Sequence, residues 1–179
     1  MLPSGPTTQP RSRNQAGSVV AWLVPLYRKR PGTAGFPRDD TGENEIQWRS
    51  AMAVERSNPS ALANPPGYSH VVKDGKTIYV AGQLSRNSAG ETVGEGNFSA
   101  QAEQAFKNVQ AALESVGSNM HHIMKMNVFM THREDIPEYR VVRAKFIPED
   151  ALPVSTLILC SGLADPVFRI EVEVVATMP

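Results

Sequence analysis

The sequence predicts an α+β domain in which a single sheet carries two helices on one face. Three observations lead to this class. A turn-forming Asp74-Gly75 pair separates two runs of strand character, two segments have apolar residues at helical spacing, and the C-terminal segment alternates apolar and polar residues. Along the chain the elements follow the order β-β-α-β-α-β-β. With 179 residues, the chain is long enough for one well-buried domain and a tail.

The charge and the rarer residue types argue against several classes of function. Lys and Arg together number 18, and so do Asp and Glu, so no overall field attracts nucleic acid or an anionic membrane. The single cysteine, Cys160, rules out an intrachain disulfide, and we expect it to be a small core residue and not a reactive thiol. The four histidines have no spacing typical of a zinc site, so we predict no metal.

Residues 1–58 are rich in Pro, Gly, Ser, Thr and Arg, and are predicted to be a disordered extension of a domain spanning residues 59–179. The apolar patch of residues 18–27 contains Pro25 and is too short to cross a bilayer, so no membrane span is expected. The extension is open to three interpretations. The first is a transit peptide, because residues 1–38 contain Arg and Lys but no Asp or Glu. The second is a signal peptide, although no cleavage site clearly follows the patch. The third is that the functional protein begins at Met52. We favour the third interpretation and a cytoplasmic protein, with a mitochondrial one as the alternative if the segment is a transit peptide.

The first half of the domain is predicted to contain a hairpin and a long helix. Residues 69–81 are typical of a hairpin, because Asp-Gly suits a type I′ turn whose two central residues have positive φ. Gly82 ends the second strand, and residues 84–97 have loop composition. A helix follows over residues 98–116, with Asn97 or Ser99 as its cap and Gly117 closing its end. Its apolar stripe consists of Phe98, Ala102, Ala105, Phe106, Val109, Ala112, Leu113 and Val116.

A strand, a second helix and a further strand are expected next. Residues 123–130 alternate as a strand does, and the apolar members of the alternation are predicted to fill the core: Met124, Met126, Val128 and Met130. Thr131 or Asp135 can cap a helix that has Pro137 in its first turn and runs to about Phe146. The continuous apolar run of residues 155–161 predicts a strand buried on both faces.

The last strand, near residues 168–175, alternates strictly. One side of it carries Phe168, Ile170, Val172 and Val174, and the other carries Arg169, Glu171, Glu173 and Val175. Two carboxylates, Glu171 and Glu173, therefore share a face. If both helices cover one face of the sheet, apolar residues on the other face, Phe129 among them, need cover from another chain. The pattern therefore predicts an oligomer.

Five short motifs between residues 64 and 177 carry a family resemblance. They are Pro-Pro-Gly-Tyr at 65–68, Val-Ala-Gly-Gln at 80–83, Lys-Met-Asn-Val-Phe-Met at 125–130, Pro-x-Ser-Thr at 153–156 and Ile-Glu-Val-Glu at 170–173. In order and spacing the chain resembles the Rid family (also called the YjgF/YER057c/UK114 family) of small imine and enamine deaminases. The resemblance implies a chorismate-mutase-like fold and a homotrimer whose sheets form a central barrel, with three ligand clefts between subunits. It also implies hydrolysis of reactive enamines or imines to a carbonyl compound and ammonia, without a cofactor.

The resemblance also implies roles for particular residues. Glu171 matches the acid that positions the hydrolytic water. In the active subgroup an Arg at the start of the first C-terminal strand grips the substrate carboxylate, and here that position is Ser155. Leu157 stands in place of a family Cys, and Arg140 in place of an Asn in the second helix. The site residues that remain are Tyr68, Gly82 (through its backbone), Thr156 and Glu171.

Three functions are therefore open. In the first, the protein is a divergent deaminase in which Ser155 and Thr156 donate hydrogen bonds and another cation supplies the missing charge; the candidates are Arg86, Arg140 and Arg143. In the second, it binds a small metabolite in the same cleft without turnover. Loss of a buried bidentate contact would cost about 2–5 kcal/mol, enough to abolish activity on small 2-imino acids unless another cation replaces it. A ribonuclease or translation inhibitor is the weakest, because the chain has no basic stripe. We prefer the deaminase, because Glu171 and Tyr68 remain.

Overall fold

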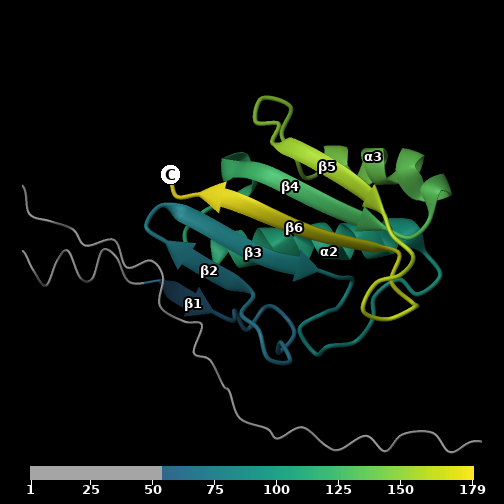
Figure 1. Cartoon of the computed structure of the whole chain (residues 1–179), viewed down its shortest axis with the longest axis horizontal. Coiled ribbons are helices and arrows are strands. Elements are labelled where there is room, and N and C mark those ends of the chain that lie inside the picture. The colour runs from purple at the N-terminus through teal and green to yellow at the C-terminus, as the bar shows by residue number, and fades with distance from the viewer. Residues whose placement is uncertain (1–53) are drawn as a thin grey trace, which may run out of the picture. The chain divides into compact units, whose positions relative to one another are not determined.

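The computed structural model describes residues 54–179, which lie within one compact unit. One layer is a six-stranded sheet in the order β1-β2-β3-β6-β4-β5, and both α-helices lie against one face of it (Figure 1). The predicted α+β class, with one sheet and two helices on one face, is confirmed. The strands are β1 (Glu55–Ser57), β2 (Val71–Asp74), β3 (Thr77–Gln83), β4 (Ile123–Met130), β5 (Val154–Leu159) and β6 (Ile170–Thr177). The helices are α2 (Phe98–Glu114) and α3 (Ile136–Ala144), with 3-10 turns η1 (Met120–His122) and η2 (Arg133–Asp135).

Several expectations fall outside this region. The transit-peptide and signal-peptide interpretations and the start at Met52 concern residues 1–53, which lie outside the described residues. Between residues 54 and 179, no helix combines the length and apolar character needed to cross a membrane.

The predicted hairpin is present, but its turn lies one residue later than the sequence indicated. Asp74 pairs with Thr77, so the two-residue connection consists of Gly75 and Lys76, and Gly75 has a positive φ of 57°. Asp74 still belongs to the strand. The structure also adds β1, which pairs antiparallel with β2 at the edge of the sheet and was absent from the predicted order. A segment of three residues is too short to show a periodic pattern.

Helix α2 forms the middle of the core. Its predicted apolar stripe is buried almost throughout, and Phe106 at its centre is fully enclosed. Asn97 caps the helix, because its side-chain oxygen accepts a hydrogen bond from the backbone N–H of Ala100. The helix ends at Glu114, and Gly117 reverses the chain with a φ of 82°.

Strand β6 lies between β3 and β4 and is antiparallel to both. Its alternation is as predicted, with Glu171 and Glu173 on the face away from the helices. The buried side chains of β4 and β6 are Ile123, Met126, Val128, Met130, Ile170, Val172, Val174 and Ala176. Met124, however, is not a core residue. Its side chain is 45% exposed, and the pairing of β4 with β6 shifts register between Ile123 and Lys125.

Strand β5 corrects another prediction. The run expected to be a strand buried on both faces forms the edge strand of the sheet, parallel to β4. Leu157 is half-buried on the helix side, whereas Val154 and Ile158 on the other side are 68% and 42% exposed. An apolar strand looks the same in sequence whether its side chains are buried by its own chain or by another chain. Periodicity alone therefore could not show that this strand lies at the edge of the sheet. Cys160, expected in the core, is half-buried just beyond this strand.

Helix α3 packs against α2 through the buried ring of Tyr139, which stacks on Phe106 with 6.4 Å between ring centroids. Asp135 occupies the N-cap position, but its side chain does not cap the helix. It forms a buried ion pair with Arg169 instead, at the start of β6. The carboxylate therefore joins the helix to the sheet.

Candidate active site

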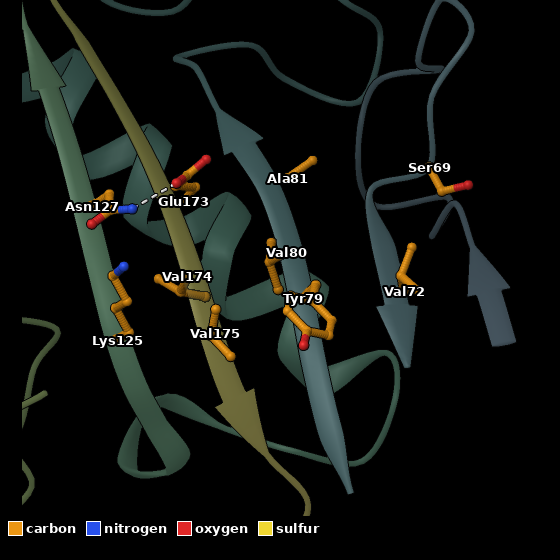
Figure 2. Close-up of a pocket in the computed structure, with 10 residues that line it drawn as sticks. All are labelled: Ser69, Val72, Tyr79, Val80, Ala81, Lys125, Asn127, Glu173, Val174 and Val175. Atoms are coloured by element: carbon orange, nitrogen blue, oxygen red, sulfur yellow. Dashed lines mark hydrogen bonds between the residues drawn. The ribbon is translucent and has the colours of Figure 1, made fainter. Parts of the chain in front are cut away.

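The face of the sheet opposite the helices is not covered by the described part of the chain. Figure 2 looks onto this face, with α2 behind the strands. Tyr79 in β3 is 50% exposed, and Lys125 and Asn127 of β4 lie beside Glu173 of β6. The Asn127 amide donates a hydrogen bond of 2.7 Å from Nδ2 to Glu173 Oε1. With their neighbours these side chains line a shallow hollow of about 360 Å³ that combines apolar and charged groups.

Glu171 lies on the same face, with its carboxylate directly over Gly82. A Cβ atom built on Gly82 would lie 1.8 Å from Glu171 Oε1 and 2.7 Å from its Cδ, far inside contact distance. The absence of a side chain at Gly82 is therefore what lets the carboxylate occupy this position. The approach occurs at an irregularity of β3, where its pairing with β6 shifts register between Val80 and Gln83.

Gly82 also lines a cavity of about 430 Å³ at this end of the sheet. Tyr68 and Arg86 line the same cavity, so the structure brings together three of the predicted site residues, with Glu171 beside them. Burial raises the pKa of Glu171, and the negative charge of Glu173 raises it further. The pKa of the Tyr68 hydroxyl is raised by burial and by the charge of Glu171, and the charge of Arg86 opposes this. These groups can therefore hold and exchange protons next to a small cavity.

A buried histidine supports the cavity wall, and the sequence analysis did not identify it. His70 Nε2 lies 2.7 Å from the carbonyl oxygen of Ala63, and its Nδ1 lies 3.2 Å from Gln83 Nε2. Because a carbonyl only accepts, Nε2 carries the proton, and Nδ1 accepts from the Gln83 amide. The His70 ring meets the edge of Tyr68 at 5.4 Å between centroids. The hydrogen bond from Gln83 thus holds the His70 ring, and this ring in turn orients Tyr68 at the cavity.

Asn108 of α2 holds the loop that carries Arg86. Its Nδ2 donates to the carbonyl oxygens of Leu84 at 2.9 Å and Arg86 at 2.8 Å, and the side chain is buried. Arg86 in turn donates from Nη1 to Gly90 O at 2.8 Å, and its guanidinium lies 4.9 Å from the centroid of Phe168. A polar residue inside an apolar helix stripe was the sequence signal for Asn108, but its partners could not be read from the sequence.

The remaining predicted site residues lie elsewhere, around β5 and α3. Ser155 lies on the helix side of β5, opposite Met126, and Thr156 points to the other face. Burial raises the pKa of Tyr139, while the nearby charge of Arg143 and the hydroxyl of Ser155 oppose the rise. Arg143 and Ser155 therefore lie beside the Tyr139 hydroxyl. Arg140 is exposed on the surface of α3.

The predicted site is thus divided within one chain. Glu171 and Gly82 lie on β6 and β3, on the uncovered face, whereas Ser155 lies on β5 with β4 in between, facing the helices. The cavity lined by Tyr68, Gly82 and Arg86 contains no residue of the Ser155 group. We call the group around Glu171 (Tyr68, Gly82, Arg86 and Glu171) the acid half, and the pair Ser155 and Arg143 the arginine half.

Comparison with known proteins identifies the family. The model of a family described as Endoribonuclease L-PSP matches residues 58–178. The chain belongs to this family, which is also the Rid or YjgF family. The resemblance drawn from the five motifs is thereby confirmed. Members are small-molecule-binding and typically oligomeric proteins.

Individual relatives support the same assignment. The 2-iminobutanoate/2-iminopropanoate deaminase of Dermatophagoides farinae is 29% identical over 124 residues, covering 68% of this chain and 95% of the relative. Protein MMF1, mitochondrial, of Saccharomyces cerevisiae is 30% identical over 115 residues, covering 64% and 74%. The crystal structure of RidA from a Psychrobacter species has a TM-score of 0.65 and 26% identity, covering 69% of this chain and 99% of that one. The chorismate-mutase-like fold is confirmed, together with a general Rid-type role.

Proposed function

We propose that this protein hydrolyses reactive imines or enamines to a carbonyl compound and ammonia. The observation that carries the proposal is the placement of Glu171, whose carboxylate lies over Gly82 beside a small cavity and has a raised pKa. The relative from Dermatophagoides farinae, whose name states deamination of 2-iminobutanoate and 2-iminopropanoate, supports this class of substrate.

The reaction needs little more than positioning and proton transfer. An imine carbon is already electrophilic, so a water molecule held next to it can add to form a C–O bond. One proton passes from the water to the imine nitrogen and gives a carbinolamine. The remaining hydroxyl proton then passes to the amino nitrogen as the C–N bond breaks, so that ammonia leaves and the carbonyl forms. Glu171 is the group that orients the water and transfers these protons, because its carboxyl lies beside the cavity and its raised pKa makes it a better proton acceptor than an ordinary carboxylate. This sequence of steps uses no cofactor.

The complete site is proposed to form between copies of the chain in a homotrimer. Two observations support this arrangement. The acid half and the arginine half lie on different faces of one sheet, so one copy cannot bring them to a common ligand. The uncovered face also exposes large apolar side chains, including Tyr79, Val154 and Ile158. A ring in which each copy presents its acid half to the arginine half of the next satisfies both conditions.

The decisive experiment follows imine decay. An amino-acid oxidase generates short-lived 2-imino acids, and their loss is measured with and without the purified full-length protein; aminomuconate-type enamines are tested separately. We expect the parent to accelerate the decay and Glu171→Gln to abolish the acceleration while keeping the same oligomeric state. Glu114→Gln is the matched control, because Glu114 is exposed at the end of α2 and its carboxylate contacts only Gln110 among the described side chains. Full activity of Glu171→Gln would remove the proposed role.

A second candidate is a protein that binds a small metabolite in the same cleft without turnover. It is favoured by one observation, the serine at position 155, where the family resemblance leads us to expect an arginine. An intact oligomer that accelerates no imine or enamine decay would favour this candidate over the deaminase. The ribonuclease or translation-inhibitor alternative is weaker because acidic and basic residues balance. We propose action in the cytoplasm, with the mitochondrion, stated in the name of the yeast relative, as the alternative.

A further inference from the structure

The proposed reaction leaves open how a substrate with a carboxylate would be held, and three arginines are available. Arg86 is already engaged within its own half of the site. Its Nη1 donates to Gly90 O at 2.8 Å, and the plane of its guanidinium covers Phe168 at 4.9 Å. It also lies in the half that contains Glu171, where a substrate carboxylate would be repelled by the catalytic one.

Arg143 is in a different situation. It is half-buried on α3, four residues after Tyr139 and hence on the same side of the helix. Its Nε–H is buried and has no hydrogen-bond partner among residues 54–179, and no carboxylate of that region forms an ion pair with it. A half-buried guanidinium with a buried, unmet N–H donor is costly, and an anion placed against it removes that cost.

Ser155 completes the arrangement. Its hydroxyl and the guanidinium of Arg143 both lie close enough to the Tyr139 hydroxyl to oppose the effect of burial on it. Ser155 is exposed and lies at the start of an edge strand, so a ligand can reach it. A short side chain at this position also leaves room for the longer Arg143 to approach from the helix. A carboxylate at this point would receive the planar fork of Arg143 and the Ser155 hydroxyl together.

We propose that Arg143, with Ser155, binds the carboxylate of the substrate. The inference rests on the proposed function only for the reaction that follows binding. The binding of a carboxylate by Arg143 does not depend on that reaction. Arg140 is excluded from the role although it is only three residues away. Its side chain is exposed on α3, where a free guanidinium is well solvated and gains less from a carboxylate.

The test measures binding separately from turnover. The probe is 2-oxobutanoate, a stable keto acid of the same shape as the imino acid, titrated into the full-length protein by calorimetry or NMR; butanone is the uncharged control ligand. We expect Arg143→Ala to weaken 2-oxobutanoate binding about 10- to 100-fold and to leave butanone unaffected. Arg140→Ala, the matched control, should change the affinity less than about threefold.

Two further variants guard against a folding effect. Arg143→Lys keeps the charge and the apolar stem but loses the fork, and should bind with intermediate affinity. The double variant Arg143→Ala/Ser155→Arg moves the guanidinium to the strand and should regain affinity. Equal binding by the parent and Arg143→Ala, a loss in Arg140→Ala instead, or no binding of 2-oxobutanoate by the parent would each overturn the inference. If binding depends on Arg143 but no imine is hydrolysed, the inference stands and the proposed reaction is wrong.

Discussion

Replacing Gly82 with alanine tests whether the position of the Glu171 carboxylate is responsible for activity. The new methyl group would lie 1.8 Å from Oε1, whereas ordinary contact begins at 3.4 Å. The carboxylate must therefore move by about 1.6 Å, the difference between these two distances. A shift of roughly 1 Å in a catalytic group can cost on the order of 10²-fold in rate. We expect Gly82→Ala to lose at least that factor in kcat.

The same substitution should affect folding only slightly. The three atoms nearest to the added methyl all belong to the Glu171 side chain, which can rotate away. An unfavourable rotamer costs about 0.5–1.5 kcal/mol, and the loss of glycine flexibility in the unfolded chain offsets part of this. The free energy of unfolding should therefore change by less than about 1 kcal/mol, measured by chemical denaturation. Gly162→Ala is the matched control, because its added methyl meets nothing within 4 Å.

The turnover and the stability of Gly82→Ala together test whether the position of the Glu171 carboxylate is responsible for activity. Parental turnover in a folded Gly82→Ala variant would refute the reasoning, because the carboxylate cannot then be in its original place. Equal losses of stability and activity would also contradict it, since the substitution would have disturbed the fold and not the site. A large loss of kcat with normal unfolding, absent in Gly162→Ala, is the expected result.

Two further predictions concern groups around the site. Asn108→Ala should lower the free energy of unfolding by about 2 kcal/mol, because the carbonyls of Leu84 and Arg86 lose their donor. Gln110→Ala, at a partly exposed position of the same helix, should change it by less than about 0.5 kcal/mol in the same denaturation experiment. Glu171 has a folded-state pKa raised above its ordinary 4.5, so its contribution to stability is lost as pH rises through that raised value. Denaturation of the parent and Glu171→Gln across pH 4–8 should show the parent losing stability relative to the variant as pH rises, and a constant difference would contradict the raised pKa.

Local rules of chain geometry explain what could be predicted from the sequence. The alternation around Glu171 places every second side chain on one face of β6, whatever the rest of the chain does. The three-and-four spacing around Phe106 likewise defines the buried side of α2, and the side chain of Asn97 caps that helix through a contact three residues away.

Other features depend on which elements become neighbours, and these were missed or misplaced. The run after Val154 forms an edge strand, although its composition suits a central one. Asp135 occupies a cap position, but Arg169 takes its carboxylate. The supports of the cavity wall, His70 and Asn108, have partners that are distant in the sequence or lie on another element.

By itself the sequence determined the family, the order of the elements and the face of β6 that carries Glu171, because motifs and side-chain periodicity are properties of short segments. Only the tertiary structure decided that the Glu171 carboxylate occupies the space a side chain at Gly82 would need, and that Ser155 lies in a different half of the site. It also decided which of the arginines is half-buried next to Ser155. These facts depend on strand order and on a register shift in β3, and long-range pairing of this kind is set by the packing of the whole core.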